Sequence, residues 1–108
     1  MVNMEASTRI SHTSALILQT IRSGYIYGFD IMDVTGLPSG TIYPALRRLE
    51  NESLVRGDWE NSKIALRQER PPRRYYKLTR QGKDALISAV ERYPLLARLA
   101  PEEKTVRR

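Results

Sequence analysis

Residues 36–50 carry the strongest structural signal in the chain and read Gly36-Leu37-Pro38-Ser39-Gly40-Thr41-Ile42-Tyr43-Pro44-Ala45-Leu46-Arg47-Arg48-Leu49-Glu50. Turn-forming residues come first, and apolar residues then recur at the i, i+3, i+4, i+7 spacing of one helix face. These apolar residues are Ile42, Ala45, Leu46 and Leu49. Pro44 has no backbone N–H and fits only a first helical turn, so we expect the helix to begin at about residues 39–41, with Ser39 or Thr41 as its N-cap.

The opposite face of this helix is polar and aromatic. It carries Tyr43, Pro44, Arg47 and Asn51, with Thr41 and Arg48 on a flank. A short helix that buries one face and shows hydroxyl, aromatic and guanidinium groups near its N-terminus suits insertion into a DNA major groove. Arg47 is the first candidate for a guanine contact, because its guanidinium presents two donors side by side.

Two more helices are predicted upstream. The first runs from Ser11 or Thr13 to Ser23, where Gly24 stops it. Its inward face is expected to contain Ser14, Ile17, Leu18 and Ile21. The second runs from about Tyr27 to Thr35, with Gly36 as a left-handed C-cap, and its inward residues are expected to be Phe29, Met32 and Ile31. Two helices joined by a glycine-containing turn are typical of a helix-turn-helix, although helical hairpins without DNA function share this pattern.

After residues 51–53 the apolar residues recur at every second position, which is the spacing of a β-strand. Alternation from Leu54 to Trp59 predicts a first strand, and residues 73–78 predict a second. The segment between them ends in Pro71-Pro72, so we expect a long, mobile loop over residues 60–72. A strand, a basic loop and a second strand after a helix-turn-helix form the wing of a winged helix.

A last helix is predicted to begin after Thr79 as N-cap and to be interrupted at Pro94. Its apolar residues continue past the proline and are Leu86, Ala89, Val90, Tyr93, Leu95, Leu96 and Leu99. Because a three-helix core is already closed, we interpret this stripe as a dimer interface. The alternative is that it packs on the first helix of its own chain. The polar tail, residues 101–108, is expected to be disordered.

The net charge of +6 is distributed unevenly along the 108 residues. Residues 1–60 carry five Lys and Arg against seven acidic residues, whereas residues 61–108 carry thirteen against five. Within residues 61–83, eight basic residues accompany a single acidic residue, Glu69. This patch should attract polyanions with a salt-dependent affinity. The alternative is a solvated loop whose charges only aid solubility.

Several function classes lack the residues they need. The chain has no cysteine and a single histidine, His12, so thiolate chemistry and a metal cage are not expected. Nothing supplies a nucleophile with its base, which argues against an enzyme, and no cofactor is predicted. The longest apolar run, Ala15-Leu16-Ile17-Leu18, is too short to span a membrane, and no signal peptide is visible. We therefore expect a cytoplasmic protein.

The quoted residues 40–50, then Leu54-Val55 and Trp59-Glu60, then residues 74–79 with Gly82, resemble the PadR-type transcriptional regulators. The resemblance spans roughly residues 15–86 and implies a short-form winged-helix repressor of bacterial or phage origin. It also implies a homodimer, formed through the C-terminal helical segment, that binds double-stranded DNA at an inverted-repeat operator. In a bacterium such a protein would be associated with the nucleoid.

The resemblance assigns roles by position. Ser39, Thr41, Tyr43 and Arg47 would belong to the recognition helix, and Lys63, Arg67, Arg73 and Arg74 to the wing. The full set of predicted DNA contacts adds Gly40, Pro44, Arg48 and Arg70 from the same two segments. The last helix contains no tryptophan for stacking planar ligands, so no small-molecule effector is identified. Trp59, the only tryptophan, is expected in the core.

Together these patterns predict a mainly α fold with a small β-hairpin. Residues 1–82 would form a winged helix-turn-helix DNA-binding domain, and residues 83–100 a dimerisation helix. The predicted function is that of a sequence-specific transcriptional regulator, in particular a repressor. The alternatives are a winged-helix module for protein interaction and a phage-type accessory protein that shapes DNA.

Overall fold

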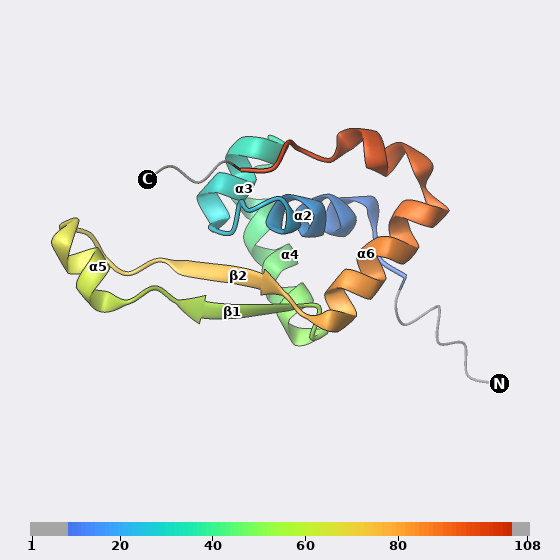
Figure 1. Ribbon diagram of the computed structural model, residues 1–108. Coiled ribbons are helices and arrows are strands. Elements are labelled where there is room, and N and C mark those ends of the chain that lie inside the picture. Colours follow the sequence, from blue (N-terminus) through green and yellow to red (C-terminus); the bar gives the residue numbers. More distant parts are fainter. Residues whose placement is uncertain (1–8, 105–108) are drawn as a thin grey trace.

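The computed structural model describes residues 9–104 as helices packed at one end of a projecting β-hairpin (Figure 1). In chain order the elements are α2 (His12–Arg22), α3 (Gly28–Thr35), α4 (Ser39–Asn51), β1 (Val55–Trp59), α5 (Ser62–Arg67), β2 (Arg74–Leu78), α6 (Arg80–Arg92) and the 3-10 helix η1 (Pro94–Leu99). The predicted mainly α fold with a small hairpin is confirmed. None of these helices is long and apolar enough to cross a membrane.

Helix α2 lies at the centre of the fold and packs against α3, α4, α6, β2 and η1. It begins where the Oγ of Ser11 accepts a hydrogen bond from the backbone N–H of Ser14, at 3.1 Å. Its predicted inward face is confirmed, because Ser14, Ile17, Leu18 and Ile21 are all buried. The largest fully buried aliphatic side chains of the core are Ile17, Leu18, Ile31, Ile42, Leu46, Leu49 and Leu86.

Helix α3 turns a different face to the core than the sequence suggested. Its buried residues are Gly28 and Ile31, which lie one helical turn apart, whereas the side chain of Phe29 is 42% exposed. The expectation that Phe29 faces inward is therefore wrong. Gly36 ends the helix with φ of 74°, which confirms the predicted left-handed C-cap.

Helix α4 begins at Ser39 and buries all four predicted apolar residues. The predicted side-chain cap is wrong, because Pro38 occupies the N-cap position with extended backbone. Its carbonyl oxygen accepts hydrogen bonds from the N–H groups of Thr41 and Ile42, at 2.9 and 3.0 Å. Ser39 already lies within the helix, so its hydroxyl cannot act as the cap.

The two strands pair antiparallel, with Val55 opposite Leu78 at the base and Trp59 opposite Arg74 toward the tip. A bridge between Tyr27 and Tyr75 covers the outer edge of β2 next to α3. Only the base of β1 reaches the core, because the hairpin leaves the helical body along its length (Figure 1). Trp59 is 65% exposed for this reason, and its predicted place in the core is wrong.

Helix α6 is capped as predicted by Thr79, whose Oγ1 accepts from the N–H of Gly82 at 3.0 Å, and it ends before Pro94. Three residues of the predicted dimer stripe, Leu86, Ala89 and Leu96, are buried in the core of their own chain. The side-chain amide of Gln19 on α2 also donates to the carbonyl of Leu96, at 2.8 Å. These three residues thus follow the alternative interpretation and pack on the first helix.

The chain beyond η1 returns to the helical body. The backbone N–H of Lys104 donates to the carbonyl of Ser23 at 2.7 Å, and its ammonium group lies 3.3 Å from the carboxylate of Asp30. The predicted disordered tail is therefore wrong for residues 101–104. Its remainder, residues 105–108, lies outside the described residues, as do residues 1–8.

Candidate nucleic-acid interface

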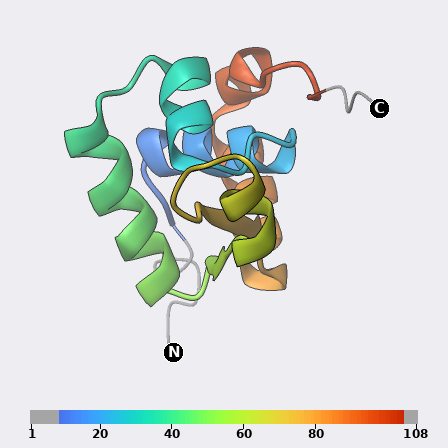
Figure 2. The same cartoon turned by 90° about the vertical axis from the view of Figure 1, so that its left-hand side faces the viewer.

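The outer face of α4 is the first part of the candidate interface. Figure 2 looks along the hairpin from its tip and shows α4 at one side of the body, with no other element beyond it. The predicted contact residues on α4 lie on this face: Ser39, Gly40, Tyr43, Pro44, Arg47 and Arg48 are exposed, and Thr41 is half-buried. This part of the predicted site is thus presented to solvent.

Tyr43 is held in place by the start of α3. A Cβ atom built on Gly28 would lie 2.6 Å from the Tyr43 ring, so the absence of a side chain at Gly28 lets the ring approach the backbone. Tyr43 nevertheless remains 42% exposed. One side of the ring therefore packs against the backbone at Gly28, and the rest faces solvent on the same helix face as Arg47 and Pro44.

The wing is the second part of the candidate interface, and its tip is folded. Residues 62–67 form the short helix α5, so the prediction of a mobile loop is wrong. The side-chain oxygen of Asn61 accepts from the N–H of Lys63 at 2.8 Å, and Ala65 is buried beneath the turn. Lys63 and Arg67 remain exposed on this helix. The tip of the wing is therefore a basic segment with a defined helical structure.

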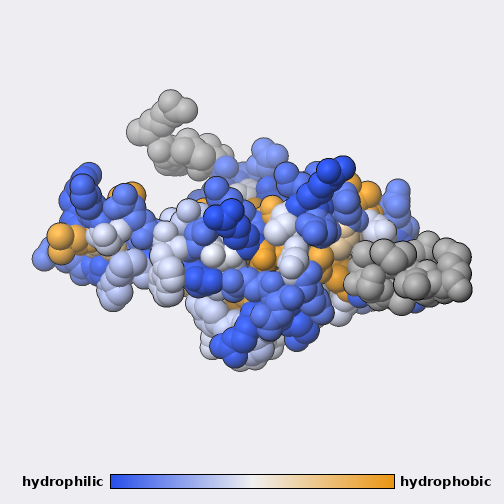
Figure 3. Space-filling model, turned by 90° about the horizontal axis from the view of Figure 1, so that it is seen from below, coloured by the Kyte–Doolittle hydropathy of each residue, from blue (hydrophilic) through white to orange (hydrophobic). Residues whose placement is uncertain are grey.

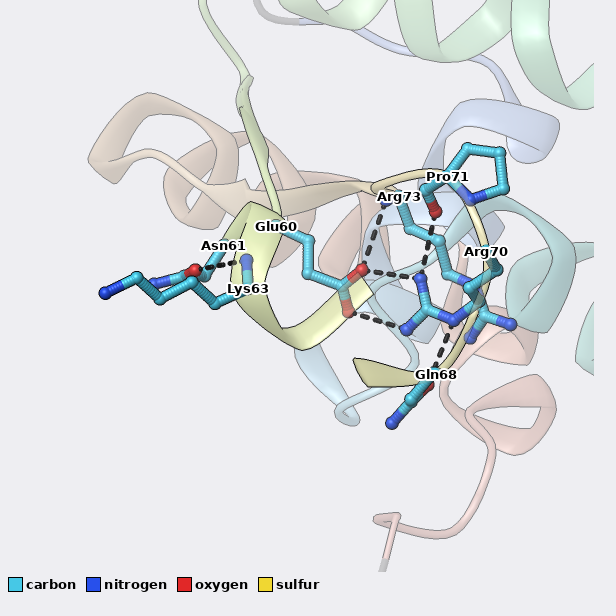
Figure 4. Close-up of polar contacts among 7 residues, drawn as sticks. All are labelled: Glu60, Asn61, Lys63, Gln68, Arg70, Pro71 and Arg73. Carbon is cyan, nitrogen blue, oxygen red and sulfur yellow. Dashed lines mark hydrogen bonds and ion pairs between the residues drawn. The ribbon is translucent and has the colours of Figure 1, made fainter. Parts of the chain in front are cut away.

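Glu60 and Arg70 close the base of this tip with a two-pronged ion pair (Figure 4). The two guanidinium nitrogens of Arg70 donate to the two carboxylate oxygens of Glu60, at 2.6 and 2.9 Å. The backbone N–H of Arg73 adds a third hydrogen bond to this carboxylate, at 3.2 Å. Arg70 thus stabilises the fold of the wing, and its role in DNA binding stays a prediction.

The ion pair should make the stability of the protein depend on acid pH. Hydrogen bonds from Arg70 and then from the Arg73 backbone lower the pKa of Glu60 from 4.5 to about 2. A lowered pKa in the folded state gives stability that is complete above the unfolded pKa and is lost as pH falls toward the folded one. We expect the difference in unfolding free energy between the wild type and Glu60→Gln to be constant at neutral pH and to shrink from pH 4.5 to pH 2. Urea unfolding of both proteins at a series of pH values measures this difference. A difference that does not change with pH would contradict a stabilising ion pair between Glu60 and Arg70.

Arg74 connects the hairpin to α4. Its guanidinium lies 2.7 Å from the carboxylate of Glu50, in the last turn of α4, and packs 5.4 Å from the ring centre of Trp59. A Cβ atom on Gly57 would lie 2.7 Å from this guanidinium, so the missing side chain opens its path across the strand. Arg74 therefore sets the position of the wing relative to α4, and its role in DNA binding stays a prediction.

Arg73 lies on an aromatic shelf between the two parts of the interface. Its guanidinium carbon is 4.8 Å from the ring centre of Phe29 and 6.0 Å from that of Tyr27. Such cation–π contacts orient the guanidinium group while leaving its charge intact. A hollow of about 190 Å³ adjoins this shelf, and its lining residues are Tyr27, Gly28, Phe29, Tyr43, Arg73, Arg74 and Tyr76.

The structure divides the predicted basic residues into two groups. Among residues 9–104, only Arg70 and Arg74 of the predicted contact residues form ion pairs. The remaining cations keep their charge available and are Arg47, Arg48, Lys63, Arg67 and Arg73. Sequence reasoning missed the supporting residues Phe29, Glu50 and Glu60, because their partners lie far away in the sequence.

The comparison with known families identifies this arrangement. Residues 17–88 match the family described as "Transcriptional regulator PadR-like family". The chain belongs to this family. The PadR-like proteins are DNA-binding transcriptional regulators, so the outer face of α4 and the wing are the surfaces to consider for DNA binding.

Solved structures support the same assignment. A PadR family transcription regulator from Clostridium difficile is 26% identical, with a TM-score of 0.68 over 82% of this chain and 94% of the other. A PadR-like transcription factor from Bacteroides fragilis is 28% identical, with a TM-score of 0.60 over 78% and 82%. A Streptococcus mutans protein at 21% identity shares the fold, with a TM-score of 0.62 over 82% and 84%. No curated protein matches the chain.

Proposed function

We propose that this PadR-like protein is a homodimeric repressor that reads an inverted-repeat operator with α4 and grips its backbone with the wing. The observation that carries the proposal is the Arg74–Glu50 ion pair, which joins the two elements that bear the available cations. DNA recognition by a winged helix needs these elements in a fixed relation, because groove spacing is set by the duplex. The proposal includes a bacterial cytoplasmic location at the nucleoid.

The two elements would perform different tasks. Arg47 on α4 would contact a base edge, and Thr41 and Tyr43 would bond phosphates or touch a thymine methyl group. Lys63 and Arg67 on the wing tip would neutralise phosphates and supply affinity with little sequence preference. The recognition helix thus selects the site, and the wing strengthens binding to it.

The dimer would form through the apolar surface that remains exposed at η1. Leu95 and Leu99 are 68% and 58% exposed, half-buried Tyr93 lines the same hollow, and Val90 is also half-buried. These residues retain the predicted role that Leu86, Ala89 and Leu96 lose to the core. A two-fold dimer would place its recognition helices about 34 Å apart, in successive major grooves.

A salt titration of DNA binding tests the division of tasks. Arg67→Gln should lower affinity for all duplexes alike and reduce the slope of log K against log salt by about one for each subunit. The matched control is Arg22→Gln, which removes one exposed arginine of α2 outside both proposed surfaces, and its slope should stay that of the wild type. Equal slopes for both variants would contradict the role of the wing. A protein-interaction module would instead retain no duplex at any salt concentration.

A further inference from the structure

The tip of the wing carries an exposed leucine that phosphate binding does not explain. Leu66 on α5 is 78% exposed, the largest exposed fraction among the large hydrophobic side chains of residues 9–104. Figure 3 shows an orange hydrophobic patch among blue hydrophilic side chains at the end of the projecting hairpin. Because Leu66 lies at the tip of the hairpin, away from the helical body, its apolar side chain is not stabilised by burial in the core.

The leucine shares one face of α5 with the two available cations of the tip. Lys63, Leu66 and Arg67 stand at i, i+3 and i+4, so their side chains project from the same side of the turn. No acidic residue occurs in this helix, and the buried Ala65 marks its opposite side. A leucine between two cations is complementary to a groove that has an apolar floor and phosphate walls.

The tip holds this face in a fixed position. Glu60 accepts three hydrogen bonds, two from Arg70 and one from the Arg73 backbone, and Asn61 caps the start of the helix. A side chain on such a preorganised support loses little conformational entropy when it binds. Leu66 is therefore presented as a rigid projection.

We propose that Leu66 is a wedge that enters the DNA minor groove and unstacks a base step, while Lys63 and Arg67 hold the phosphates on either side. This inference rests on the proposed binding of duplex DNA. Apolar side chains inserted from the minor groove kink the duplex by about 20–90°, and pyrimidine–purine steps open at the lowest cost. The wing would thus select flexible steps outside the bases that α4 reads.

Energy transfer between dyes at the two ends of a bound duplex tests the proposal. The wild type should bring the ends closer, and Leu66→Ala should lose most of this bend and about tenfold in affinity. Ile64→Ala is the matched control, because Ile64 is also exposed on α5 but points nearly opposite to Leu66. It should bend DNA as the wild type does.

A second variant separates apolar insertion from charge. Leu66→Lys should recover affinity through its added cation but leave the duplex straight. A bend that survives in Leu66→Ala or Leu66→Lys would overturn the wedge. A wild type that binds duplex DNA without bending it would also overturn the wedge while leaving the proposed function intact. Failure of the wild type to bind any duplex would overturn both.

Discussion

Gly82→Ala should lower the free energy of unfolding by about 2 kcal/mol and the melting temperature by about 8 °C. Gly82 lies in the first turn of α6, directly against the carbonyl oxygen of Leu54 at the base of β1, and an added Cβ atom would collide with that oxygen. Overpacking against main chain costs about 3 kcal/mol. The better helix propensity of alanine offsets about 1 kcal/mol of this cost.

Gly40→Ala is the matched control for this substitution. Gly40 also lies in the first turn of a helix, and nothing lies within 4 Å of the position that its Cβ would take. We expect Gly40→Ala to leave the free energy of unfolding unchanged or to raise it by up to about 1 kcal/mol. Its melting temperature should therefore stay the same or rise. Thermal unfolding followed by circular dichroism compares the variants, and equal melting temperatures for both would contradict the close approach at Gly82.

Arg47→Ala should have the largest effect on DNA recognition. Arg47 is exposed on the outer face of α4 and forms no ion pair within residues 9–104, so its guanidinium is available for a base edge. Losing one two-pronged guanine contact costs about 1–3 kcal/mol, or roughly 5- to 150-fold in affinity. Affinity should fall for the cognate operator only, and the protein should lose its base preference at one position in each half-site.

Fluorescence anisotropy with cognate and scrambled duplexes measures this effect. Arg48→Ala serves as the control, because Arg48 is an exposed neighbour on the flank of α4, where a phosphate contact is expected. It should weaken both duplexes by similar factors. If Arg47→Ala also weakens both duplexes equally, Arg47 holds the backbone and does not read a base.

The sequence predicts those parts of the fold that depend on neighbours along the chain. Apolar spacing located the buried face of α4 and of α2, and Gly36 and Thr79 marked helix ends through local backbone chemistry. Alternation located both strands within one residue of their bounds. The outer face of α4 followed from the same spacing, because residues opposite a buried stripe must face solvent.

The sequence could not predict which basic residues are already paired. Arg74 finds Glu50 across 24 positions, and Arg70 finds Glu60 across 10, so charge counting treated both arginines as available. Phe29 was expected on the inward face of its helix, but it lies partly exposed against the guanidinium of Arg73, 44 positions further along the chain. Trp59 was misplaced because alternation does not tell where a strand leaves the body. In each case the arrangement of segments distant in the sequence decided the outcome.

Selection of bound sequences from random duplex DNA, with the mass of the complex measured on the selected duplex, tests most directly whether α4 reads an operator as part of a dimer. We expect a two-fold-symmetric site with half-sites about one helical turn apart, bound by two chains. Enrichment should depend on Arg47. A complex that enriches no sequence at any salt concentration, or that carries a single chain on an asymmetric site, would contradict the proposed function.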